Sequence, residues 1–200
     1  MTAQTERYTA YLIIGAPGSG KGTQGRTLGT IPRFYHCACG DVFRSLELRT
    51  SLGQKFLEYS SRGELVPDDL TVQLWKLRIE ANVDAGLFKP DIDHLVLDGI
   101  PRNLEQARLM EEMVDVRLVF HLFCADQEEL VSRIRKRALK ENRYDDASDE
   151  VIRRRLLTYE EETRPVLDFY GLDRMVTLDA LKPPVAVLGR VIEHILARSP

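Results

Sequence analysis

A short glycine-rich stretch near the start of the chain carries the residues best suited to chemistry. Residues 15–23 read Gly-Ala-Pro-Gly-Ser-Gly-Lys-Gly-Thr and follow the unbroken apolar run 11–14. Glycines have no Cβ, so backbone N–H groups can surround a phosphate, and Lys21 adds a positive charge. A helix that begins here would also point its positive N-terminal end at the anion. The stretch therefore predicts a phosphate-binding loop between a buried strand and a helix.

The position after Lys21 departs from the general P-loop pattern. That pattern, G-x-x-x-x-G-K-[ST], places a hydroxyl directly after the lysine, where it binds Mg²⁺. Here Gly22 occupies the position and Thr23 follows it. The alternative interpretation is a strand–helix turn without a ligand. Such a turn has no need of both the glycine cluster and the lysine, so a phosphate site is favoured.

A second candidate stretch closes another apolar run. Asp98 follows the residues His-Leu-Val-Leu at 94–97, and Arg102 comes four residues later. Taken alone, Asp98 could equally be a turn or helix-capping residue. A carboxylate that ends a buried strand beside a phosphate-binding loop is, however, well placed to hold Mg²⁺ or its water shell. Arg102 is close enough in the chain to reach a phosphate of the same ligand.

Cations are concentrated in a third region, residues 133–155. Arg133 and Arg137 are four residues apart and therefore share a helix face. Arg143 falls in a polar loop, and Arg154 lies two turns into the helix that follows. Each cation alone could be a solvated surface charge. As a set they oppose folding unless an anion or nearby carboxylates offset them, which indicates a polyphosphate ligand.

Composition limits the possible classes of protein. The chain has 200 residues, 44% of them hydrophobic and 30% charged, which is typical of one globular core. A net charge of −3 argues against a general nucleic-acid binder. The three cysteines form no C-x-x-C pair, so no zinc site is expected. No apolar run reaches the roughly 18 residues of a membrane span, and no signal peptide is visible. A cytoplasmic protein is expected.

Apolar strands and amphipathic helices alternate along the chain. Asp68 is expected to cap one helix whose buried face holds Leu70, Leu74 and Leu77, and Pro165 to kink another. Such alternation predicts a parallel sheet covered on both faces, with ligands bound at the carboxyl ends of the strands. The expected strands cover 10–15, 35–38, 94–98, 117–124 and 174–178. The expected helices cover 20–28, 50–61, 69–84, 103–114, 126–138, 148–170 and 184–197, and a short one begins near 40.

Several segments, in order and at family-like spacings, resemble the adenylate kinase family over nearly the whole chain. They are GAPGSGKGTQ (15–24), GDVFR (40–44), GELVPDDL (63–70), LDGIPRNLEQA (97–107), RYDD (143–146) and RRRLLTYEEETRPVLDFY (153–170). The displaced Thr23 fits the resemblance, because that family carries GKGT. The resemblance implies an α/β P-loop fold of three layers, α/β/α, with a five-stranded parallel sheet. A single kinase domain would comprise a core (1–37, 68–133, 148–200), a monophosphate-binding insert (38–67) and a short lid without zinc (134–147).

The resemblance also implies the reaction Mg·ATP + AMP ⇌ 2 ADP and assigns roles to residues. Asp98 would hold Mg²⁺, through water. ATP would be bound by Gly18, Ser19, Gly20, Lys21, Gly22, Thr23, Arg133 and Lys182. AMP would be bound by Cys39, Arg44, Glu64, Leu65, Val66, Gly99, Ile100, Pro101, Arg102, Gln106, Arg143 and Arg154. The residues expected to stabilise the transferred phosphoryl group are Lys21, Arg44, Arg102, Arg137, Arg143 and Arg154.

Departures from the family pattern fall on the side of the acceptor nucleoside. Cys39 stands where adenylate kinases usually have Thr, and Ile100 where they usually have Phe. Gln106 favours AMP, because pyrimidine monophosphate kinases of the superfamily typically have Asn there. A UMP/CMP kinase and a catalytically silent adenylate sensor remain alternatives, although a silent homologue usually lacks some of the cations. The expected partners are the small nucleotides ATP, AMP and ADP, with no nucleic acid or membrane, and the chain is expected to be a monomer.

Overall fold

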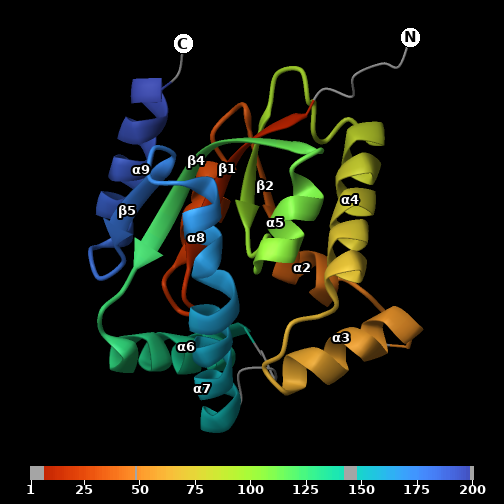
Figure 1. Ribbon diagram of the computed structural model, residues 1–200, viewed down its shortest axis with the longest axis vertical. Coiled ribbons are helices and arrows are strands. Elements are labelled where there is room, and N and C mark those ends of the chain that lie inside the picture. Colours follow the sequence, from red (N-terminus) through yellow and green to blue (C-terminus); the bar gives the residue numbers. More distant parts are fainter. Residues whose placement is uncertain (1–6, 48, 142–147, 199–200) are drawn as a thin grey trace.

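The computed structural model describes residues 7–47, 49–141 and 148–198, and its centre is a five-stranded parallel sheet (Figure 1). The strand order is β2-β3-β1-β4-β5, and every strand pair is parallel. The predicted five-stranded parallel sheet is thereby confirmed. The strands are β1 (Tyr8–Gly15), β2 (Phe34–Ala38), β3 (His94–Asp98), β4 (Val114–Phe123) and β5 (Met175–Asp179).

Helices cover both faces of the sheet, so the core has two halves. Side chains alternate along β1: Tyr11 and Ile13 enter one half, and Leu12 and Ile14 the other. The first half is closed by α1 (Lys21–Leu28) and α9 (Pro184–Arg198). The second is closed by α2 (Cys39–Arg44), α4 (Asp68–Asp84), α5 (Leu104–Met110) and α8 (Pro165–Tyr170). This is the expected three-layer α/β/α arrangement.

Three further helices gather beyond the carboxyl ends of the strands, at the lower side of Figure 1. They are α3 (Ser51–Ser61), α6 (Gln127–Glu141) and α7 (Asp149–Thr158). Ser148 caps α7, as its Oγ accepts from the Val151 N–H at 3.2 Å. Between α7 and α8 the helix passes through a π-helical turn, Tyr159–Thr163, directly before Pro165. Pro165 has no N–H to continue the α-helical bonding, so the predicted kink takes the form of this turn.

The helix α4 corrects two predictions. It begins at Asp68 itself, with Pro67 at the N-cap and no side-chain cap, so Asp68 does not cap it. Trp75 and Ile79 are 0% exposed, and the expected Leu70 and Leu74 are partly buried against the same core, whereas Leu77 is 55% exposed. The burial of the large Trp75 ring in the core sets the rotation of α4 about its axis, and the spacing of the leucines does not predict that rotation. Within the described residues no helix is long and apolar enough to cross a lipid bilayer.

Candidate active site

A cleft of about 580 Å³ opens at the carboxyl ends of the central strands β1 and β3. Its lining includes Gly15, which ends β1, and Asp98, which ends β3 beside it. The cleft extends toward β5 in one direction and toward β2 and α3 in the other, since its walls include Lys182 and Phe56. Its volume lies in the range of small-molecule sites in proteins. The strand ends therefore meet where the alternation of strands and helices predicted a ligand.

The glycine-rich loop forms the floor of this cleft. Gly18 and Gly20 have φ angles of +84° and +95°, which residues with a Cβ rarely adopt. A Cβ on Gly18 would also lie 2.8 Å from the carbonyl oxygen of Leu130, whereas one on Gly20 would meet nothing within 4 Å. The loop thus packs against α6 at Gly18 and leaves open space at Gly20. The hydroxyl of Ser19 is buried, and no hydrogen bond satisfies it within the described protein. Such a hydroxyl suits a ligand oxygen.

Lys21 extends along the loop, and its ammonium is held by backbone carbonyls. Its Nζ donates to Gly15 O at 2.6 Å and to Ala16 O at 3.1 Å. Burial in the cleft lowers the pKa of Lys21 to about 8. The carboxylate of Asp98 opposes this shift. Neighbouring cations lower the pKa further; they are Arg102, Arg137 and Arg155. The cleft is therefore strongly positive and gains free energy from any anion that enters it.

Asp98 is the one carboxylate at the end of β3, and it directly faces the loop. Burial alone would raise its pKa, but His36, Lys21 and Arg102 together hold the pKa below its ordinary value. His36 Nε2 lies 3.9 Å from Asp98 Oδ2, an ion-pair distance that is too long for a hydrogen bond. A Cβ on Gly22 would lie 3.3 Å from Asp98 Oδ2. This contact explains the departure from the general P-loop pattern, because a hydroxyl-bearing side chain at position 22 would press on Asp98.

A lone carboxylate beside a phosphate-binding loop fits Mg²⁺, which is usually held by one or two carboxylates together with substrate phosphates and water. Asp98 remains negatively charged in the cleft because its pKa is lowered. Nowhere in the described parts of the chain do three or more His, Cys, Asp or Glu side chains converge as they do in a protein metal cage. The residues present therefore suit a metal that arrives with a nucleotide.

The wall of the cleft toward β2 is apolar and is closed by α2 and α3. The rings of Phe43 and Phe56 stack with centroids 5.1 Å apart, and both line the cleft. Cys39, the first residue of α2, also lines it, whereas Cys37 is buried in the core. Of these two cysteines, Cys39 is the one in the described lining of the cleft. Burial raises the pKa of the Cys39 thiol to about 11, so it remains protonated at neutral pH.

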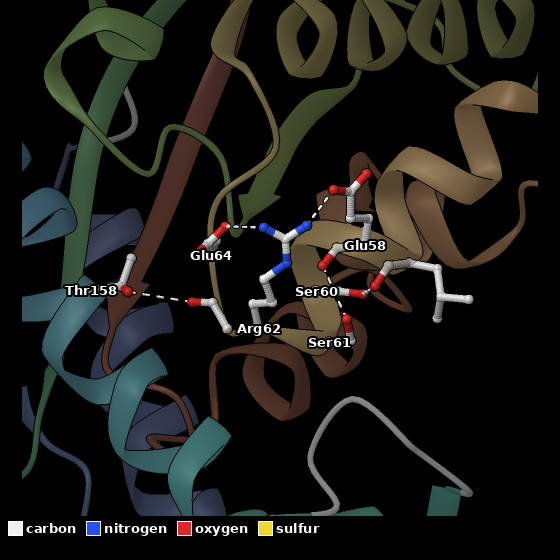
Figure 2. Close-up of polar contacts among 8 residues, drawn as sticks. Glu58, Ser60, Ser61, Arg62, Glu64 and Thr158 are labelled. Carbon is white, nitrogen blue, oxygen red and sulfur yellow. Dashed lines mark hydrogen bonds and ion pairs between the residues drawn. The ribbon is translucent and has the colours of Figure 1, made fainter.

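The loop that follows α3 joins this wall to α7 (Figure 2). Thr158 Oγ1 donates to the Gly63 carbonyl at 3.3 Å, and a Cβ on Gly63 would lie 3.1 Å from the Val151 carbonyl. Arg62 forms ion pairs with Glu58 and with Glu64, the latter at 3.8 Å. Glu64 lines the cleft, so these contacts fix one rim of it against the cation-rich helix.

Comparison with known proteins identifies this arrangement. A family model described as "Adenylate kinase" matches residues 13–174. The chain belongs to the adenylate kinase family. Among related proteins, the adenylate kinase of Thermobifida fusca is 36% identical over 94% of this chain and 98% of its own length. Those of Mycolicibacterium paratuberculosis and Bifidobacterium longum are each 37% identical, over 90% and 92% of this chain and 96% and 98% of their own lengths.

Most residues singled out by the adenylate kinase resemblance do come together in the cleft. Its lining includes Gly18 to Thr23, Cys39, Arg44, Glu64, Leu65, Val66, Gly99, Pro101, Arg102, Gln106, Arg133, Arg137 and Lys182. Ile100 is 2% exposed and belongs to the core, outside the described lining of the cleft. Arg143 lies outside the described residues. The short helix α2 holds Arg44 at the rim through a hydrogen bond to Asp41 at 2.6 Å.

On α7, the arginine that lines the cleft lies one position after the arginine expected from the adenylate kinase resemblance. Arg155 lines the cleft, whereas Arg154 is exposed and is absent from the described lining. Sequence reasoning missed Arg155 because three arginines follow one another at 153–155, and helical spacing alone does not say which one faces inward. Both Arg154 and Arg155 pack close to Gly63, and only the burial of the two side chains separates them: Arg155 is half-buried, whereas Arg154 is exposed. On α6, Lys136 and Lys140 also line the cleft and were not expected.

Proposed function

We propose that this chain catalyses the reversible transfer of a phosphoryl group from Mg·ATP to AMP, giving two ADP. The observation that carries the proposal is the single cleft, which joins the glycine-rich loop and Lys21 to Gln106 through a row of cations. One nucleotide binds over the loop and the second beside Gln106, so that their phosphates meet between them. The adenylate kinases among the relatives are similar to this chain over most of its length, which supports the same reaction here.

The chemistry follows from the charges in the cleft. The acceptor is already an anionic phosphate oxygen, so no general base is required. Catalysis then consists of positioning the phosphates in line and stabilising negative charge. The N–H groups of Gly18 to Thr23 surround the donor phosphates, and Lys21 turns from its carbonyl partners toward them. The arginines that stabilise the transferred group are Arg44, Arg102, Arg137, Arg143 and, in the position expected for Arg154, Arg155.

Further residues position the two nucleosides. Arg133 lies against the adenine of ATP, with Lys182 nearby; in the structure its Nη1 donates to the Ala180 carbonyl at 2.8 Å, which fixes the guanidinium at that end. The acceptor nucleoside lies between the stacked phenylalanines and the backbone of Glu64, Leu65 and Val66. Gln106 binds the base edge of the monophosphate. The monophosphate-binding insert and the lid expected for the family would close over the nucleotides and exclude water, which would limit hydrolysis of ATP.

Asp98 holds Mg²⁺ through water in this proposal. When bound, Mg²⁺ would neutralise part of the phosphate charge at this carboxylate. Asp98 suits this role because its carboxylate stays negatively charged, and because Gly22 leaves space beside it. The proposal includes no zinc, nucleic acid or membrane. In this proposal the chain acts as a monomer. A cytoplasmic location agrees with the three free cysteines, which suit a reducing compartment.

The test is a coupled assay of ADP formation from Mg·ATP with AMP, CMP, UMP or GMP as the acceptor. We expect AMP to have the highest kcat/KM. If CMP or UMP is preferred, the proposed phosphoryl-transfer mechanism stands, but the acceptor is a pyrimidine monophosphate and not AMP. ATP binding without any acceptor-dependent formation of ADP would overturn the kinase proposal and favour an adenylate sensor.

A further inference from the structure

A hydrogen-bond network outside the phosphate region fixes the side chain of Gln106. Its Nε2 donates to Asp68 Oδ1 at 2.8 Å, and its Oε1 accepts from the backbone N–H of Arg102 at 2.8 Å. Asn103 Nδ2 donates to the same Asp68 oxygen at 2.8 Å, and Asn103 Oδ1 accepts from the Gln106 N–H at 2.9 Å. Asp68 comes from the first turn of α4 and the amides from the start of α5. The network therefore joins residues that are 35 and 38 positions apart.

The hydrogen-bond partners of Gln106 determine which terminal atom of its carboxamide is the oxygen and which is the nitrogen. A backbone N–H can only donate a hydrogen bond, and a carboxylate can only accept one. The oxygen of the amide must therefore face Arg102, and the nitrogen must face Asp68. Turning the amide over would place two donors against each other at Arg102 and two acceptors against each other at Asp68. Gln106 is 1% exposed, so water cannot relieve either contact.

The groups that remain on Gln106 define a pattern for the base. A carboxamide has two N–H donors and two acceptor lone pairs, and the network uses one of each. One N–H and one lone pair remain for a ligand, and Gln106 lines the cleft. An adenine edge, with N1 as acceptor beside the 6-amino donor, pairs with this arrangement. Hypoxanthine reverses both groups, with an N1–H donor beside a 6-keto acceptor. Cytosine and uracil differ from each other in the same way.

We propose that Asp68 is a positioning residue that makes the acceptor site selective for amino bases over keto bases, by holding the Gln106 amide in one orientation. This inference rests on the proposed function, in which Gln106 contacts the base of the acceptor. Asp68 reaches no base itself in this proposal. Its carboxylate lies at the positive N-terminal end of α4, which favours the negative charge at this point. Arg102 N–H supplies one anchor of the amide, and Asp68 supplies the second.

The matched test compares Asp68→Asn with Asp69→Asn, using AMP and IMP as acceptors. The two variants lose the same charge on the same turn of α4, but Asp69 is exposed and lies outside the network. AMP and IMP differ only in the edge that Gln106 contacts. The wild-type protein should prefer AMP by about 100-fold or more in kcat/KM, because keto bases leave buried polar groups unpaired. An asparagine at 68 can offer a donor as well as an acceptor, so only the Arg102 N–H would still oppose the turned amide and the preference for one orientation would weaken.

In Asp68→Asn the ratio of kcat/KM for AMP to that for IMP should fall by about tenfold, the order expected for losing a hydrogen bond to a charged group. In Asp69→Asn the ratio should stay within about twofold of wild type. A merely structural role of Asp68 would lower both acceptors in equal proportion and leave the ratio unchanged, which would overturn the proposal. Thermal melting by circular dichroism checks that each variant folds, and Asp68→Ser provides a second variant with the same expected direction.

Failure of this inference can be separated from failure of the proposed function. If the wild-type protein prefers CMP to AMP, the proposed acceptor is wrong. The same variants are then compared with CMP and UMP, because cytosine and uracil differ in their amino and keto groups as adenine and hypoxanthine do. If the wild-type protein forms ADP but does not distinguish amino from keto acceptors in either pair, the role of Asp68 is refuted while the kinase activity stands.

Discussion

The two ends of the cleft hold their polar side chains in different ways. At the phosphate end, Lys21 Nζ bonds to the carbonyls of Gly15 and Ala16, and its pKa is lowered to about 8 because burial leaves its charge poorly solvated. At the acceptor end, the Gln106 amide is fixed by Asp68 and by the backbone of Arg102. The phosphate end therefore presents a charged ammonium that carbonyls hold, whereas the acceptor end presents a neutral amide that a carboxylate and a backbone N–H hold in place.

This difference follows from what each end must distinguish. Coulomb attraction between unit charges acts over several ångströms and depends little on direction, so cations can bind a polyphosphate without exact prior alignment. A choice between two neutral bases depends on individual hydrogen bonds, which weaken steeply with misalignment. The acceptor end therefore needs a rigid frame. Thr163 Oγ1 adds to this frame by donating to the Arg102 carbonyl at 2.6 Å, from the π-helical turn after α7.

The largest expected effect tests whether position, and not only net charge, matters at the phosphate end. Arg155→Ala should lower kcat by about 100-fold or more, because it removes a cation from the cleft where charge develops. Arg154→Ala removes the same charge from the adjacent, exposed position and should change kcat by no more than about twofold. Steady-state kinetics of both variants measure the difference.

Equal losses in the two arginine variants would mean that the cleft responds to overall charge alone. A large loss in Arg154→Ala with little change in Arg155→Ala would restore the residue expected from the sequence. Either result would break the comparison between the two ends, because catalysis would then not depend on which arginine of α7 lines the cleft.

The sequence predicts the phosphate end well and the acceptor end poorly, for a physical reason. Gly18 to Thr23 are consecutive, and Asp98 ends an apolar strand, so local rules place both at the same edge of a parallel sheet. The role of Asp68 depends on amides that lie 35 and 38 residues away. Its position before a helix suggested a cap, because helix-capping rules consider only neighbours in the chain. Long-range contacts between α4 and α5 overrule that local preference.

The helices show the same limit. Most elements are expected within a few residues of their true ends, because strong apolar periodicity marks them. The rotation of a helix about its axis is less well determined. On α4, Leu70 and Leu74 pack against the core as expected, but Leu77 is exposed and Trp75 is fully buried. On α7, the run of arginines hides the one that faces the cleft. Periodicity gives the helix, and tertiary packing decides which side is buried.

The second prediction concerns pH and the charge of Lys21. Because its pKa in the folded protein is lowered to about 8, the ammonium is lost as pH rises through about 8. The kcat/KM for ATP should fall above that pH, approaching about tenfold for each pH unit. The same group acts on stability with the opposite sign. Its ordinary pKa is 10.5, so the unfolded state binds more protons between about 8 and 10.5, and this contribution to stability rises with pH there.

The control for the pH profile is Lys21→Arg, which stays charged throughout this range. Its kcat/KM is expected to be low, and the loss above pH 8 should disappear. A profile of unchanged shape in Lys21→Arg would assign the titration to another group and remove the evidence that the phosphate end is poorly solvated. Measurements of kcat/KM from pH 6 to 10, with the melting temperature recorded at each pH, supply both readings.

The smallest effect tests how rigid the backbone is behind the phosphate end. Gly25→Ala would place a Cβ 2.4 Å from His36 Nε2, so the imidazole that faces Asp98 must move. Overpacking of this kind costs about 1–3 kcal/mol, so the melting temperature should fall by several degrees. Gly189→Ala, in the middle of α9, meets nothing within 4 Å and should instead stabilise the fold by about 0.5–1 kcal/mol. Thermal denaturation by circular dichroism compares the two. Opposite shifts would show that the phosphate end rests on a tightly packed helix. A rise in both melting temperatures would mean that His36 moves aside at little cost and that only the acceptor end is rigid.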